Sequence, residues 1–141
     1  DAIIELVEEG VDLVIVIGGY NSSNTNHLAE ISSRYCTTYH VSDSGCLISS
    51  DEIRHKPIEG EETISTGWFP SGPVTIGLTA GASTPNIKVD ESICRILSFR
   101  GLSPESLEPA SRYRRCIGQG VSRPGRGARC RRLYVPPEDP A

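Results

Sequence analysis

The chain has 141 residues, enough for one domain with a hydrophobic core but not for two large ones. It contains no apolar run of about eighteen residues and opens with no signal-peptide pattern, so we expect no membrane-spanning helix and no secretion signal. The net charge of −4 is unevenly spread, because residues 1–108 carry 16 acidic and 6 basic side chains whereas residues 109–141 carry 2 acidic side chains and 8 arginines. We expect an acidic globular domain over residues 1–103 and a basic extension over residues 104–141.

The first residues of the chain bear on whether it begins within a longer protein, and its cysteines bear on its redox environment. The chain has no methionine, and residues 2–9 look like the end of a helix that stops at Gly10, so we expect it to begin partway through a longer protein. An odd number of cysteines without a CxxC pair indicates neither a disulfide framework nor a zinc site, and free thiols in a reducing cytosol are expected. The five cysteines are Cys36, Cys46, Cys94, Cys116 and Cys130.

The sequence of the first half of the domain predicts a strand, then a helix, then a second strand. Residues 12–17 are almost all apolar and do not alternate, which is typical of a buried parallel strand. Residues 23–34 predict the following helix, and residues 36–41, rich in β-branched and aromatic side chains, predict a second strand. The inner face of the helix is expected to carry Leu28, Ala29 and Ile31.

A less regular segment separates this unit from a third strand and a second helix. Between residues 46 and 72 we expect a short helix near Ser50 to Arg54, then irregular structure with Trp68 and Phe69 docked on the domain. Residues 73–78 predict the third strand. Thr84 is expected to cap the next helix and Pro85 to occupy its first position. Apolar residues at helical spacing then predict its packing face, namely Val89, Ile93, Ile96 and Leu97.

Strands that alternate with helices predict an α/β domain of three layers around a parallel sheet. From residue 104 onward the periodicity is lost, and residues 112–132 combine arginine, glycine and proline, so we expect a disordered tail. The tail arginines could contact nucleic acid through phosphates, but the segment lacks the aromatic interleaving of an RNA-binding segment, so nucleic acid is not the favoured partner.

Two polar turns contain the candidate ligand-binding residues. Each follows a buried strand, contains glycine and precedes a helix: Gly18-Gly19 leads into Ser22, Ser23 and Asn24, and Gly81 leads into Ser83 and Thr84. In parallel sheets ligands bind outside the carboxyl ends of the strands, and free N–H groups beside hydroxyl and amide donors suit an oxyanion. Neither turn contains lysine or arginine, so neutral donors would hold the phosphate or diphosphate group.

The alternative for each turn alone is an ordinary helix cap, for which serine, threonine and asparagine are common. The repetition of the pattern with matching glycines favours one anion pocket built from both turns. Neither a P-loop nor a GxGxxG dinucleotide motif is present.

The segments GGYNSSNTNHLAEI and TIGLTAGASTPN closely resemble two segments of the LytB/IspH family, the 4-hydroxy-3-methylbut-2-enyl diphosphate reductases of the non-mevalonate isoprenoid pathway. The resemblance runs from about residue 1 to about residue 97, and the polar stretch 47–73 is similar to the longer plant and cyanobacterial form. It implies that the chain is the C-terminal one of three similar α/β domains around a [4Fe–4S] cluster. The parent enzyme would remove the allylic hydroxyl of its substrate with two electrons and two protons.

Carried over by position, the resemblance assigns diphosphate contacts to Ser22, Ser23, Asn24 and Ser83. It places the cluster cysteines and the catalytic residues in the earlier domains, so no catalytic residue and no metal ligand is assigned in this chain. The implied partners are the diphosphate substrate, the missing N-terminal domains and a ferredoxin or flavodoxin-type electron donor. The implied location is the bacterial cytoplasm, or the plastid for a plant-type source.

The remaining reactive side chains are not assigned to the site. His27 is expected on a helix surface, and His40 and His55 are expected to be structural or solvent-facing. Cys36 and Cys94 are expected to be packing residues. Two other hypotheses stay open: a stand-alone α/β module that binds a phosphorylated metabolite, and a nucleic-acid-associated protein that acts through its tail.

Overall fold

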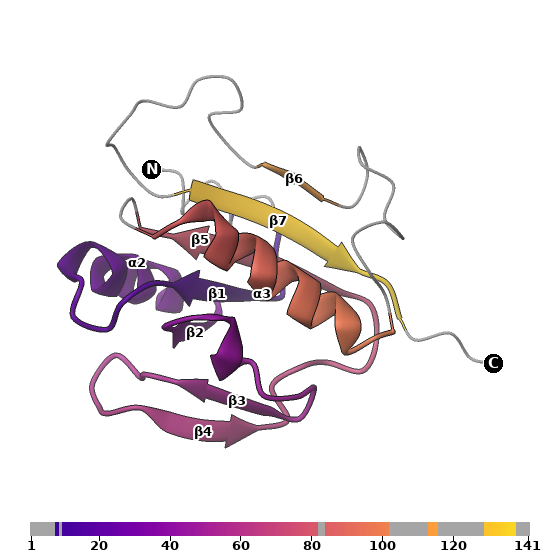
Figure 1. Cartoon of the computed structure of the whole chain (residues 1–141), viewed down its shortest axis with the longest axis horizontal. Coiled ribbons are helices and arrows are strands. Elements are labelled where there is room, and N and C mark those ends of the chain that lie inside the picture. The colour runs from indigo at the N-terminus through magenta and orange to yellow at the C-terminus, as the bar shows by residue number, and fades with distance from the viewer. Residues whose placement is uncertain (1–7, 9, 82–83, 102–112, 116–128, 138–141) are drawn as a thin grey trace.

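The computed structural model describes residues 8, 10–81, 84–101, 113–115 and 129–137. Five strands form one sheet in the order β2-β1-β5-β7-β6, and β3 and β4 form a separate hairpin beside it (Figure 1). The strands are β1 (Leu13–Ile17), β2 (Thr37–Val41), β3 (Glu52–His55), β4 (Thr63–Thr66), β5 (Val74–Ala80), β6 (Tyr113–Arg115) and β7 (Arg129–Val135). The helices that lie wholly within the described residues are α2 (Ser23–Ser33) and α3 (Asn86–Ser98), and residues Ser44–Cys46 form the 3-10 turn η1.

The central part of the sheet is parallel. β1 pairs in parallel with β2 on one side and with β5 on the other, whereas β7 runs antiparallel to both β5 and β6. The predicted α/β domain with a parallel sheet is therefore confirmed for the strands β1, β2 and β5. No helix in the described part of the chain is long and apolar enough to cross a membrane.

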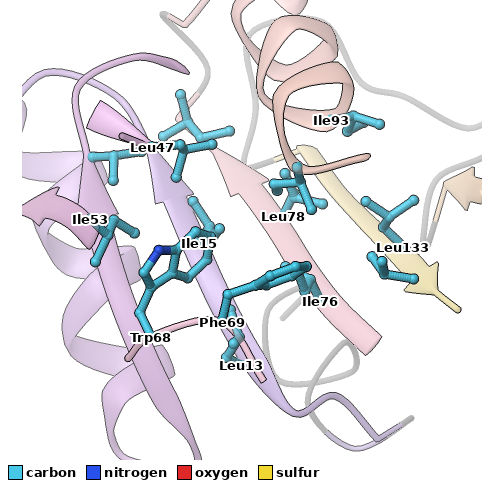
Figure 2. Close-up of a cluster of buried hydrophobic side chains, with 14 of the residues drawn as sticks. Leu13, Ile15, Leu47, Ile53, Trp68, Phe69, Ile76, Leu78, Ile93 and Leu133 are labelled. Atoms are coloured by element: carbon cyan, nitrogen blue, oxygen red, sulfur yellow. The ribbon is translucent and has the colours of Figure 1, made fainter. Parts of the chain in front are cut away.

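β1 is buried on both faces, which explains why its sequence does not alternate. Because successive side chains point to opposite faces of a sheet, the odd-numbered residues of β1 join one core and the even-numbered ones face the other side. The first core lies under α3 and the hairpin (Figure 2), whereas α2 packs on the opposite face beside β1 and β2. The core on the α3 side includes Leu13, Ile15, Ile17, Leu47, Ile53, Trp68, Phe69, Ile76, Leu78, Ile93 and Leu133.

The two helices bury the faces that their sequences predict, with one exception. In α3 all four predicted packing residues are buried: Val89, Ile93, Ile96 and Leu97. In α2 Leu28 and Ala29 are buried, but Ile31 is only partly covered. Of the helix end predicted over residues 2–9, all but Glu8 lies outside the described residues.

The predicted helix near Ser50 to Arg54 is wrong, because β3 and β4 form an antiparallel hairpin there. Ile53 is fully buried while its neighbours Glu52 and Arg54 are exposed, which is the two-residue period of a strand. Trp68 and Phe69 are buried as predicted, and the indole Nε1 of Trp68 donates to the carbonyl oxygen of Ser49 at 2.8 Å.

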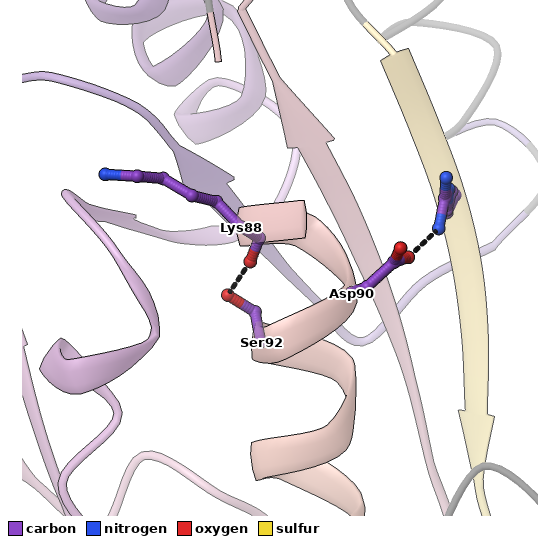
Figure 3. Close-up of polar contacts among 4 residues, drawn as sticks. Lys88, Asp90 and Ser92 are labelled. Atoms are coloured by element: carbon purple, nitrogen blue, oxygen red, sulfur yellow. Dashed lines mark hydrogen bonds and ion pairs between the residues drawn. The ribbon is translucent and has the colours of Figure 1, made fainter. Parts of the chain in front are cut away.

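The predicted disorder over residues 104–141 is wrong for β7, which extends the sheet beyond β5. Leu133 and Val135 are fully buried, so this arginine-rich strand contributes apolar side chains to the core. Arg131 of β7 forms a salt bridge with Asp90 of α3, and its Nη1 lies 2.7 Å from Oδ1 of Asp90 (Figure 3). Lys88 extends from the first turn of α3 away from β7. Residues 102–112, 116–128 and 138–141 lie outside the described residues.

Candidate anion-binding site

The two polar turns lie next to each other at one edge of the sheet. β1 and β5 are neighbours, and their last residues, Ile17 and Ala80, pair directly. The chain then leaves β1 for α2 on one face of the sheet and leaves β5 for α3 on the other. This divergence is the topological switch point at which doubly wound α/β folds bind their ligands.

Two buried threonines hold the turns together. Thr84 is 6% exposed, and its hydroxyl donates to the carbonyl oxygen of Ile17 at 3.3 Å, which ties the second turn to the end of β1. Thr25 is fully buried between the turns: a Cβ on Gly18 would lie 2.7 Å from its Oγ1, and a Cβ on Gly81 would also lie 2.7 Å from it. Both glycines are thus required by close packing, and Gly18 in addition has a φ of +155°.

In the first turn, Ser22 caps the helix, whereas Ser23 and Asn24 are exposed to solvent. Ser22 is the N-cap of α2, as the alternative interpretation predicts, and its Oγ accepts from the backbone N–H of Thr25 at 3.3 Å. Ser23 and Asn24 occupy the first helical turn, are exposed, and form no side-chain hydrogen bond with any other residue that the structure describes. No acidic residue lies in the first helical turn of α2, where its charge would repel an anion.

The second turn is described only in part, because Ser83 lies outside the described residues together with Ala82. The predicted capping role of Thr84 is wrong, since its hydroxyl is committed to Ile17. Pro85 is the N-cap residue rather than the first helical residue, and α3 begins at Asn86. No side chain caps α3 and no acid lies in its first turn, so its N-terminal N–H groups lack a side-chain acceptor among the described residues.

Tyr20 and His40 support the first turn from the β2 side, and the sequence did not single out Tyr20. Nε2 of His40 lies 3.0 Å from the carbonyl oxygen of Gly18. The rings of Tyr20 and His40 pack edge to face, with their centroids 5.1 Å apart. The Tyr20 hydroxyl donates to Oε2 of Glu62 at 2.8 Å and so fastens the hairpin connection to the turn. Burial lowers the pKa of His40, the hydrogen bond to Gly18 partly opposes this shift, and the charge of Lys56 adds a smaller lowering, so the neutral ring is favoured. The carbonyl oxygen of Gly18 can only accept, so Nε2 is the donor.

Burial is also the main cause that raises the pKa of the Tyr20 hydroxyl, followed by its hydrogen bond to Glu62. A phenol that stays protonated remains a donor to the carboxylate. The contact is therefore not lost through ionisation of the phenol.

The described cysteines do not fit a metal cluster. Cys36 is half-buried just before β2, Cys46 is buried in η1, and Cys94 is exposed on α3. Within the described ranges no three histidine, cysteine or acidic side chains come close enough to hold a metal ion. His27 is exposed on α2.

The fold defines an α/β domain of the doubly wound type, in which the carboxyl ends of β1 and β5 and the turns that follow them lie side by side. Residues 1–97 match the family model described as LytB protein, and the chain belongs to the LytB family.

Curated relatives of this chain include cyanobacterial proteins named 4-hydroxy-3-methylbut-2-enyl diphosphate reductase. The protein of Picosynechococcus sp. is 44% identical over 112 residues, which cover 79% of this chain and 26% of the relative. The proteins of Trichodesmium erythraeum and Gloeobacter violaceus are each 46% identical, over 71% and 72% of this chain and 25% of each relative. The chain thus spans about a quarter of the length of these relatives. No solved structure is significantly similar to it.

Proposed function

We propose that this chain supplies the substrate's diphosphate contacts in a 4-hydroxy-3-methylbut-2-enyl diphosphate reductase, through Ser22, Ser23, Asn24 and Ser83. The observation that carries the proposal is the meeting of the two turns at the switch point, with Thr25 packed against both glycines. Family membership supports the reaction class, because the relatives carry the name of that reductase.

The chemistry of the turns suits a diphosphate. Serine hydroxyls and an asparagine amide donate to phosphate oxygens without adding positive charge, and the start of α2 adds backbone N–H groups and a partial positive charge. Ser23 and Asn24 have donors that no other described residue uses. The diphosphate group would therefore be held without disrupting any internal hydrogen bond of these two side chains.

The redox step needs parts beyond the described residues. In the parent enzyme a [4Fe–4S] cluster would deliver the two electrons, but the described cysteines do not converge on one point. We place the cluster ligands and the catalytic groups on N-terminal domains, and we include a ferredoxin or flavodoxin-type donor as electron source. The cellular site would be the bacterial cytoplasm, or the plastid for a plant-type source.

Titration of the 141-residue chain with inorganic diphosphate, followed by backbone-amide NMR, tests the pocket. Alanine at Ser22, Ser23 or Asn24 should each weaken binding by about two- to tenfold, the equivalent of one hydrogen bond. Ser33→Ala is the matched control, because Ser33 is exposed in the last turn of the same helix and its hydroxyl, among the described residues, donates to the carbonyl oxygen of Glu30 alone. Absent binding, or equal losses in control and motif variants, would reject the pocket.

The reductase assignment needs a second assay. The chain is joined to the upstream domains of a cyanobacterial relative and tested for reduction of 4-hydroxy-3-methylbut-2-enyl diphosphate with a strong one-electron donor. Activity that falls on replacement of Asn24 by alanine supports the proposal. Diphosphate binding without activity in the joined protein would instead support a stand-alone module for a phosphorylated metabolite.

A further inference from the structure

We infer that Thr25 is a positioning residue, which fixes the Ser22 hydroxyl as a donor to the bound diphosphate. The inference rests on the function proposed above and adds a residue that touches no ligand. Thr25 is fully buried, whereas the motif residues that precede it are partly or fully exposed.

The hydrogen-bond inventory of Ser22 carries the argument. A serine hydroxyl has two acceptor lone pairs and one proton to donate. Oγ of Ser22 accepts from the backbone N–H of Thr25 at 3.3 Å and from the Oγ1 hydroxyl of Thr25 at 3.1 Å. Both acceptor positions are thus occupied by one residue, and the proton of Ser22 has no acceptor among the residues that the structure describes.

A hydroxyl arranged in this way donates outward in a fixed direction. Without the second bond from Thr25, the Ser22 O–H could rotate and water could take the vacant lone pair. An oxyanion accepts hydrogen bonds and cannot donate them, so a hydroxyl restricted to donation matches it. The bond from Thr25 also polarises the Ser22 O–H, because hydrogen bonds in a chain strengthen one another.

The position of Thr25 is itself rigid. Its Oγ1 lies 2.7 Å from the site that a Cβ would take on Gly18 and on Gly81, and its Cγ2 lies 2.9 Å from the Gly18 position. A threonine side chain is stiff at χ1, and here both branches are enclosed by backbone of the two turns. One side chain therefore sets the separation of the turns and the direction of the Ser22 donor together.

The inference predicts different behaviour for two conservative substitutions. Thr25→Val keeps the shape of the side chain but removes the hydroxyl, so Ser22 loses one of its two donors. Thr25→Ser keeps the hydroxyl but removes the methyl group. If Thr25 were merely a packing residue, Thr25→Val would be the milder of the two changes.

The test is titration of the 141-residue chain with inorganic diphosphate, with denaturant unfolding measured in parallel. Thr25→Val should weaken diphosphate binding by about two- to tenfold, and Thr25→Ser should stay within about twofold of the unmodified chain. Ser22→Ala combined with Thr25→Val should bind no more weakly than Ser22→Ala alone, because Thr25 acts through Ser22. If Thr25→Val does not fold, Thr25→Ala, which adds no bulk, should show the same loss and the same non-additivity.

The outcomes separate the two claims. If Ser22→Ala weakens binding while Thr25→Val and Thr25→Ala do not, the positioning role is wrong and the proposed function stands. The positioning role is equally wrong if the losses at Ser22 and Thr25 simply add. If neither Ser22→Ala nor any other motif variant changes diphosphate binding, the proposed function itself is wrong.

Discussion

Gly81→Ala isolates a single atomic contact at the centre of the site. Gly81 has no positive φ, so alanine is compatible with its backbone. The added Cβ would lie 2.7 Å from Oγ1 of Thr25, whereas the next atom that it meets, Cβ of Thr25, is at 3.9 Å. Because Thr25 is fully buried and stiff, the clash is relieved only by shifting the turn. Overpacking of this kind costs about 1–3 kcal/mol.

The same substitution also restricts the unfolded chain, which stabilises the folded state by about 0.4–1 kcal/mol. The net effect of Gly81→Ala should be a loss of about 1–2 kcal/mol in the free energy of unfolding. In a Thr25→Ala background the clashing oxygen is absent, so Gly81→Ala should be neutral or stabilising there. The sign of its effect should thus reverse between the two backgrounds.

The four proteins to compare are the unmodified chain, Gly81→Ala, Thr25→Ala and the double variant. Their free energies of unfolding can be measured by urea unfolding followed by fluorescence, because the chain has one tryptophan, Trp68, which is 3% exposed in the core. Gly19→Ala is the matched control, since a Cβ there would meet nothing within 4 Å. An equal cost of Gly81→Ala in both backgrounds would refute the packing argument, and so would a cost of Gly19→Ala as large as that of Gly81→Ala.

Three further predictions concern β7, the first turn and the hairpin. Leu133→Ala should lower the free energy of unfolding by about 2–4 kcal/mol because Leu133 is fully buried in β7, whereas Tyr134→Ala, on an exposed position of the strand, should cost about 1 kcal/mol or less. Burial holds the pKa of His40 below its ordinary 6.5, so the unfolded chain binds a proton more readily than the folded one. The stability that the neutral His40 contributes should therefore be present above pH 6.5 and be lost as the pH falls below it, so the fall should be shallower in His40→Gln. Tyr20→Phe removes the bond to Glu62 and should quicken hydrogen exchange at the β4 amides, while Glu62→Gln, which keeps an acceptor oxygen, should have the smaller effect.

Each of these predictions has an opposing outcome. Equal effects of the two β7 substitutions would mean that the strand does not join the core. Stability that rises on acidification through pH 6.5, or an unchanged pH profile in His40→Gln, would contradict the neutral histidine beneath the turn. Unchanged exchange in Tyr20→Phe would mean that the hairpin is held without its contact to the turn.

Sequence patterns predicted the elements that form the site, because these are the most strongly encoded ones. An unbroken apolar run marked β1, and apolar residues at helical spacing marked α3. The hairpin was missed because a four-residue strand such as β3, with only Ile53 fully buried, leaves too little periodicity to distinguish it from a helix. β7 was missed because arginines dominate its composition, while Leu133 and Val135 supply the buried face.

For the site, the sequence predicted that both turns are at one edge of the sheet but not what holds them there. The contacts of Thr25 with Gly18 and Gly81 join residues from separate strand–helix units, and no local pattern encodes such a contact. Thr84 illustrates the same limit: as the residue before a proline it has the pattern of a cap, yet its hydroxyl is committed to the carbonyl of Ile17 in another strand.

The late position of β7 in the sequence has a consequence for synthesis of the chain. β5 pairs with β7 along its whole length, from Val74 opposite Val135 to Ala80 opposite Arg129. While the ribosome is still producing the intervening residues, one side of β5 presents a row of backbone groups without their eventual partner. Exposed strand edges of this kind invite pairing with other nascent chains, so the emergence of β7 should coincide with a sharp gain in resistance to aggregation.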